Sequence, residues 1–121
     1  MEITLTEWLE GTQVRRTELE DYGRSLLPAD IGERHADMDI AIKCADDAGR
    51  LLADAESFLS QAKAIAMYNA LKDEDLGAKE REIVIKNEVR HVQRIVDGLK
   101  VTTKTLMNRL YSNMNSNRSR L

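Results

Sequence analysis

This chain of 121 residues is poor in the residue types that stabilise small disulfide-rich or aromatic-rich domains. It has one cysteine, Cys44, one proline, Pro28, and five aromatic side chains. A single cysteine excludes an intrachain disulfide and favours a reducing compartment. A core made mostly of Ala, Val and Leu buries modest area per residue, so a lone monomer is expected to be only marginally stable.

Long apolar runs are also missing. The longest clean one covers residues 64–68, which is far too short to cross a bilayer. Residues 1–7 carry neither a basic segment nor an apolar stretch, and this argues against a signal peptide. We therefore expect a soluble, cytoplasmic protein that does not bind membranes.

What the sequence does have is a high content of helix-forming residues, with no sustained alternation of period two. We predict an all-α single domain over residues 1–121. Helices are expected at about 5–27, 30–72 and 76–112, followed by a polar tail at 113–121. Pro28 ends the first element, and Asp30 with Glu33 forms a capping box for the second. Gly11 leaves open whether residues 5–27 form one helix or two.

Apolar residues in the third predicted helix recur at steps of four and three, which is the heptad spacing of a helix packed along another helix. A second heptad series, rich in alanine, runs through residues 41–66. In an antiparallel pairing the small residues of one series face the larger residues of the other, as close packing requires. The pairs are Ala45 with Leu106, Ala48 with Thr103, Leu52 with Leu99, Ala55 with Val96, Leu59 with Val92, Ala62 with Val89 and Ala66 with Ile85. We therefore predict a long, coiled-coil-like antiparallel hairpin that turns near Asp75.

The second helix has a wider apolar surface than one partner can cover. Beside its heptad series, Cys44, Leu51, Phe58 and Ile65 follow at spacings of seven residues. This surface must meet the first helix or a second subunit. We predict a homo-oligomer, or a complex with a protein partner, whose contact surface includes Trp8, Leu51, Phe58 and Ile65.

Residues suited to catalysis or cofactor binding are scattered. His35 and His91 lie on different predicted helices without a second ligand at metal-binding spacing. Cys44 is expected to be buried, and no Gly-rich phosphate loop occurs. We predict no enzymatic activity, no cofactor, no metal site and no catalytic residue.

Acidic residues are frequent in the second predicted helix. They are Asp37, Asp39, Asp46, Asp47, Asp54 and Glu56. All-helical nucleotide pyrophosphatases use such carboxylates to hold magnesium, but they need a matching acidic set on a facing helix. The third predicted helix offers only a few acids, interleaved with Lys and Arg. A solvated helix face is therefore favoured over a metal-dependent nucleotide hydrolase, which is kept as an unlikely alternative.

The end of the chain is basic, because no acid follows Asp97. Basic side chains can neutralise phosphates, and a tyrosine can stack on a base. The candidate nucleic-acid-binding residues are Lys100, Lys104, Arg109, Tyr111, Arg118 and Arg120. Cations at a helix C-terminus are also favoured by the helix dipole without any ligand, so both interpretations stay open.

The ending Leu99 to Arg120, together with the alanine-rich helix and acidic turn before it, resembles small all-helical proteins carried by tailed bacteriophages and prophages. The resemblance implies a gene that serves recombination, replication or the blocking of host defence, and it supplies no functional residues. The leading hypothesis is a non-enzymatic helical interaction protein that acts by binding another macromolecule. The second is a nucleic-acid-binding accessory of recombination or replication that uses the basic end.

Overall fold

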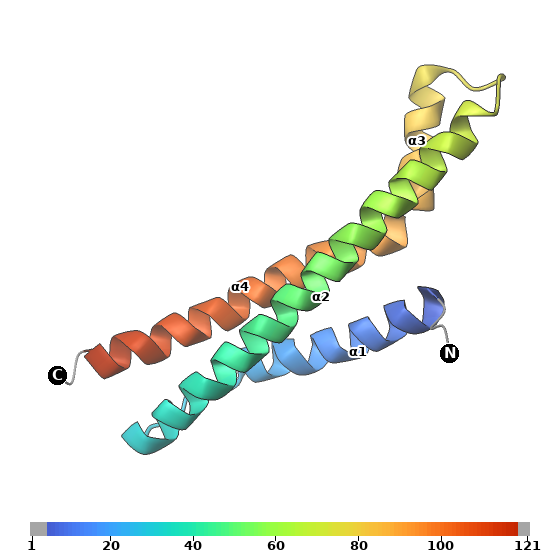
Figure 1. Ribbon diagram of the computed structural model, residues 1–121. Helices are drawn as coiled ribbons and strands as arrows, with labels where there is room; N and C mark the ends of the chain where they lie inside the picture. The colour runs from blue at the N-terminus through green and yellow to red at the C-terminus, as the bar shows by residue number, and fades with distance from the viewer. Residues whose placement is uncertain (1–4, 119–121) are drawn as a thin grey trace.

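A computed structural model describes the backbone of residues 5–118 and the side chains of residues 7–115. Over these residues the chain forms helices only, α1 (Leu5–Arg24), α2 (Ile31–Leu71), α3 (Ala78–Glu88) and α4 (Arg90–Arg118). Figure 1 shows α2 and α4 lying side by side in opposite directions, with α1 beside them and α3 continuing α4 to the tip of the hairpin. The predicted all-α antiparallel hairpin with a shorter N-terminal helix is confirmed.

The ends of the helices follow from local chemistry. α1 is one continuous helix through Gly11, and it ends before Pro28. Asp30 caps α2, because its side-chain Oδ2 accepts a hydrogen bond from the Glu33 backbone N–H at 3.2 Å. After α2 the chain turns through residues 72–77, where the backbone N–H of Leu76 donates to the Asp73 carbonyl. The hairpin therefore reverses at the acidic segment, as predicted.

The third predicted helix is divided in two at Val89. This residue has φ −95° and ψ 2°, outside the helical range, and regular bonding resumes where Gln93 N–H donates to the Val89 carbonyl. β-branched residues, which have lower helix propensity, are concentrated just before the break at residues 83–85 and at Val89 itself.

The predicted polar tail also begins too early. α4 continues to Arg118, and Asn113 is fully buried inside the fold.

The core lies between α2 and α4. Leu52 and Leu99 pack in one cluster, and Ala45 and Leu106 in another, as the predicted register requires. On α2 the buried apolar residues are Ala41, Ala48, Ala55, Leu59, Ala66 and Ala70. Opposite them, Val92, Val96, Leu99 and Leu106 of α4 are also buried. Small residues on one helix thus let larger ones on the other fill the interface.

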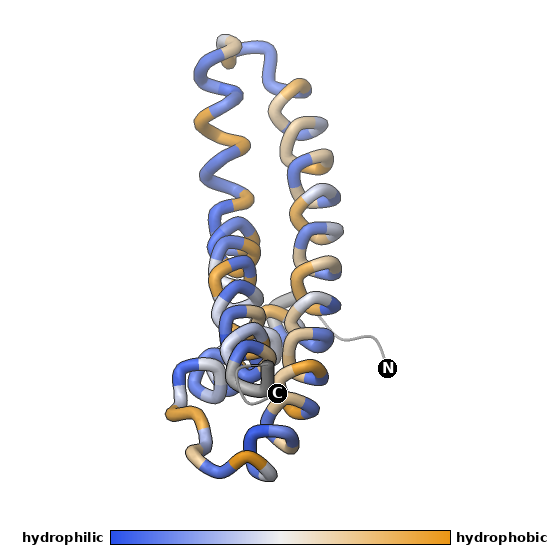
Figure 2. The backbone as a smooth tube through the Cα atoms, turned by 90° about the vertical axis from the view of Figure 1, so that its left-hand side faces the viewer, coloured by the Kyte–Doolittle hydropathy of each residue, from blue (hydrophilic) through white to orange (hydrophobic). Residues whose placement is uncertain are grey.

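α1 covers only part of this pair. It packs mainly on α4, less on α2 and not on α3. In Figure 2, α1 lies beside the lower part of the molecule and does not extend to the hairpin turn at the top. We call residues 60–88 the arm. The rest of the described fold, which includes α1, is the proximal region. No helix of the described chain is long and apolar enough to span a membrane.

Candidate interaction surface

A buried ion pair lies where α1, α2 and α4 meet. Arg109 of α4 donates from Nε to Asp37 Oδ2 and from Nη2 to Asp37 Oδ1, both at 2.9 Å. The two side chains are only 4% and 8% exposed. This two-point contact fixes the planar guanidinium against the carboxylate, which joins α2 to α4.

The same guanidinium also joins α1 to the pair. Arg109 Nη1 donates to the carbonyls of Tyr22 at 2.9 Å and Ser25 at 2.6 Å, at the end of α1. Its Cζ atom lies over the Tyr22 ring, 4.4 Å from the ring centre. The Tyr22 hydroxyl donates to Asp37 Oδ1 at 2.8 Å, and Asn113 Nδ2 donates to Asp37 Oδ2 at 2.7 Å. We call Tyr22, Asp37, Arg109 and Asn113 the polar cluster.

The polar cluster shifts the ionisation of its members. Burial by itself raises the pKa of Asp37, but hydrogen bonds from Arg109, Asn113 and Tyr22 outweigh it and lower that pKa below the ordinary value. Burial, followed by the hydrogen bond to Asp37, raises the pKa of Tyr22 to about 12. At neutral pH the carboxylate is therefore charged and the phenol neutral, and each group has partners suited to that state.

The structure contradicts two predictions from the sequence. Asp37 was assigned to a solvated acidic face, but it is buried because α4 and the end of α1 close over it. Arg109 was a candidate for binding phosphate, but its guanidinium is committed to Asp37 and to the α1 carbonyls. The predicted heptad series gave no signal for this pair, because the step of four after Leu106 leads to Leu110 rather than Arg109, and Asp37 is not a member of the alanine-rich series.

The other candidate residues for nucleic acid remain accessible where they are described. Lys100 and Lys104 are exposed on α4, and Tyr111 is about half exposed. The side chain of Arg118 and all of Arg120 lie outside the described residues. The three described residues share the solvent side of α4, but Arg109 does not join them.

The predicted partner surface is divided between two uses. The rings of Trp8 and Phe58 lie 4.5 Å apart, so α1 itself covers Phe58. Leu51 is half-buried and packs against both core clusters. Ile65, the next residue along the same line, lies in the arm and is 62% exposed. α1 therefore occupies most of the predicted surface and leaves Ile65 uncovered.

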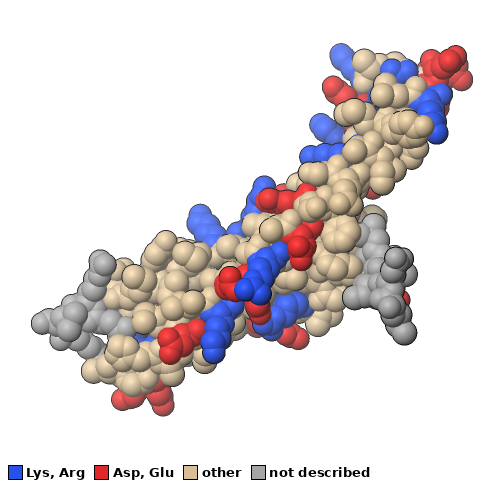
Figure 3. All heavy atoms as spheres, in the orientation of Figure 1, with Lys and Arg blue, Asp and Glu red and all other residues tan. Residues whose placement is uncertain are grey.

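The arm carries a group of exposed apolar side chains. They are Ile65, Met67, Tyr68, Leu71 and Ile83, each more than half exposed. No residue of α3 is buried, and the buried residues of α2 within the arm are Ala66 and Ala70. In Figure 3 an uncharged stretch runs along this part of the molecule between charged side chains at its tip and edges, and charged side chains of both signs also cover the middle. The arm is thus the least covered apolar part of the described fold.

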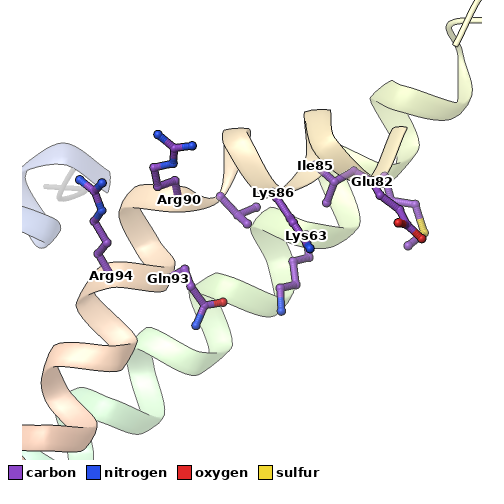
Figure 4. Close-up of a pocket in the computed structure, with 9 residues that line it drawn as sticks. Lys63, Glu82, Ile85, Lys86, Arg90, Gln93 and Arg94 are labelled. Carbon is purple, nitrogen blue, oxygen red and sulfur yellow. The ribbon is translucent and has the colours of Figure 1, made fainter. Parts of the chain in front are cut away.

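A groove of about 700 Å³ lies at the base of the arm, between α2 and the α3–α4 break. Met67, Ile85 and Val89 give it an apolar lining. Figure 4 shows the side chains of Lys63 and Lys86 reaching over the groove from its two walls, with Arg90 and Arg94 extending outward along one edge. Glu82 is the acidic residue that contributes to its lining. We call this feature the basic groove.

Other side chains that could react or bind a metal ion are not arranged for it. Cys44 is half-buried rather than fully buried as predicted, and burial raises the pKa of its thiol, which disfavours the reactive thiolate. Among the described residues no group of three or more His, Cys, Asp or Glu side chains is placed to hold a metal ion.

Comparison with known proteins adds no relative. The chain matches no protein-family model, no curated protein and no solved structure.

Proposed function

We propose that this chain is a non-enzymatic helical interaction protein that self-associates through its arm. The observation that carries the proposal is the line Leu51, Phe58, Ile65 on α2. α1 packs on the first two residues, whereas Ile65 lies beyond the start of α1 and is exposed. A helix from a second copy would cover Ile65 in the way that α1 covers Phe58.

The accessible surface of the chain supports this proposal. The structure exposes 8447 Å². A compact monomer of 13.7 kDa is expected to expose about 6,600 Å². The excess of roughly 1,800 Å² is more than the ~800 Å² that one partner loses in an interface of standard size. The fold as a whole therefore exposes enough surface for such an interface, and the arm carries several of its uncovered apolar side chains.

The biological setting is proposed from the sequence alone. The resemblance of residues 40–120 to phage-encoded helical proteins favours an accessory role, such as blocking a host defence by binding another macromolecule. A protein of this kind needs a rigid surface rather than a reactive centre, and the rod of paired helices supplies one.

Self-association is tested by sedimentation equilibrium over a wide range of protein concentration. We expect the wild-type mass to rise above 13.7 kDa with concentration, and Ile65→Gln to shift the protein toward monomer. Ile42→Gln is the matched control, because Ile42 is also an exposed isoleucine of α2 but lies in the proximal region. A wild-type monomer at every concentration, or an equal effect of both variants, would reject self-association through the arm.

Nucleic-acid binding is the second candidate, and the exposure of Lys100, Lys104 and Tyr111 favours it. Contacts with phosphates make such binding steeply salt-dependent. We expect any complex with single-stranded DNA to weaken as salt rises and to be lost in Lys100→Glu combined with Lys104→Glu. The absence of a complex at low salt would remove this candidate.

A further inference from the structure

The basic groove combines an apolar lining with basic side chains on both walls, and self-association through Ile65 does not involve these side chains. Lys63 approaches it from α2, and Lys86 from α3, so two ammonium groups face one apolar channel (Figure 4). Among the described residues neither lysine forms an ion pair that would compensate its charge. Like charges on opposite walls repel each other, and a negatively charged ligand between them would remove that repulsion.

The floor of the groove narrows the choice of ligand. Met67 and Ile85 are apolar and partly exposed, so a purely ionic ligand would leave them without a partner. The channel lies between two helices, which is where an amphipathic helix docks with its apolar face inward and its charged flanks along the rim. The phosphates of a nucleic acid could pair with the basic side chains of the rim, but they would leave the apolar floor without a partner.

Another contact of this molecule shows neighbouring helices that present opposite charges to each other. α1 lies beside the acidic part of α2, and there it presents a base, since Arg15 Nη2 contacts Asp47 Oδ2 at 2.6 Å. A helix beside the basic groove would show the same charge complementarity if it presented carboxylates. Arg90 and Arg94 along one edge extend the positive rim toward α4.

We propose that the basic groove binds an acidic amphipathic helix of a partner protein. Its apolar residues would pack on Met67 and Ile85, and its flanking Asp or Glu side chains would pair with Lys63 and Lys86. This inference rests on the proposed role in protein interaction, but it does not depend on self-association through Ile65. Ile65 lies between Lys63 and Met67 in the sequence but on a different face of α2, outside the groove lining.

The test measures binding of a labelled synthetic helical peptide by fluorescence anisotropy. The peptide has about 14 residues, roughly 20 Å as a helix, with Leu at steps of three and four and Glu on both flanks. The protein carries Ile65→Gln so that self-association does not compete. We expect saturable binding, and at least about tenfold weaker binding when Lys replaces every Glu of the peptide.

Variants of the protein locate the site. Lys63→Glu with Lys86→Glu should weaken peptide binding at least about tenfold, and the milder Lys63→Gln with Lys86→Gln should cause a smaller loss. Lys100→Glu with Lys104→Glu makes the same change of net charge outside the groove and should leave binding intact. Met67→Gln should weaken binding without changing charge. Thermal melting followed by circular dichroism checks that each variant is folded.

Three results would overturn the proposal. The first is no binding of the acidic peptide to the folded protein. The second is equal loss of binding in the two charge-reversed pairs, which would indicate a diffuse electrostatic effect. The third is that single-stranded DNA, rather than the peptide, binds in a manner that depends on Lys63 and Lys86. Failure of self-association in sedimentation, with peptide binding retained, would reject the proposed oligomer and leave this site standing.

Discussion

The proximal region and the arm share α2 as one wall, but they differ in how many helices close the core. In the proximal region α1 adds Leu19 to the α2–α4 interface, and large residues such as Leu99 and Leu106 are fully buried. In the arm no third helix covers α2 and α3, and α3 has no buried residue. Two helices can pair along a seam, but a third is needed to enclose large side chains. The proximal region is therefore expected to contribute most of the stability of the fold, whereas the surface of the arm is available for contacts.

The strongest way to break the proximal region is to remove one member of its buried ion pair. We expect Asp37→Ala to lower the free energy of unfolding by about 3–5 kcal/mol, because Arg109 is left buried without its counter-charge. Asp39→Ala is the matched control on an exposed site of the same helix, and it should change stability by no more than about 0.5 kcal/mol. Urea unfolding measures both, and similar losses would contradict the importance of the polar cluster.

Truncation of an apolar side chain should show the same contrast with a somewhat smaller effect. Leu99 is fully buried, so Leu99→Ala should cost about 2–5 kcal/mol of unfolding free energy through the cavity it leaves. Leu71 lies in the arm and is 58% exposed, so Leu71→Ala should cost no more than about 0.5 kcal/mol. A large loss for Leu71→Ala in unfolding experiments would show that the arm is buried in an obligate assembly.

Acid should act on the proximal region through Asp37. The pKa of this group lies below its ordinary value of 3.8 when the protein is folded, so its pairing stabilises the fold above that pH. The contribution is lost as the pH falls through the lowered pKa. We expect the melting temperature to drop on acidification below pH 3.8, and to drop less in Asp37→Asn, whose stability is already reduced at neutral pH. Parallel pH profiles of the two proteins would contradict this assignment.

The smallest expected effects concern two helical glycines with different surroundings. A Cβ at Gly49 of α2 would meet nothing within 4 Å, so Gly49→Ala should raise stability by about 0.5–1 kcal/mol through helix propensity. A Cβ at Gly23 of α1 would lie 2.9 Å from Thr105 Cγ2 of α4, so Gly23→Ala should push the helices apart and cost about 1–3 kcal/mol. Thermal melting distinguishes the opposite signs, and a stabilising Gly23→Ala would show that α1 moves freely.

Much of this fold was accessible from the sequence because heptad spacing is a local pattern. It identified the antiparallel hairpin, its turn near Asp75 and the register that brings Leu52 to Leu99. The candidate sites were less accessible. The sequence marked Ile65 as part of a partner surface, but it could not show that α1 would cover Phe58 and stop short of Ile65. It also missed the basic groove, because Lys63 and Lys86 belong to different helices.

The sequence by itself determined where the chain is helical and which faces of α2 and α4 meet, because both depend on residue spacings within a few turns. The burial of Asp37 with Arg109 and the exposure of the arm were decided only by the tertiary structure. Each depends on which third element lies beside a given residue. A charged side chain on a helix has the same local pattern whether water or a buried counter-charge faces it, so only the folded arrangement distinguishes the two.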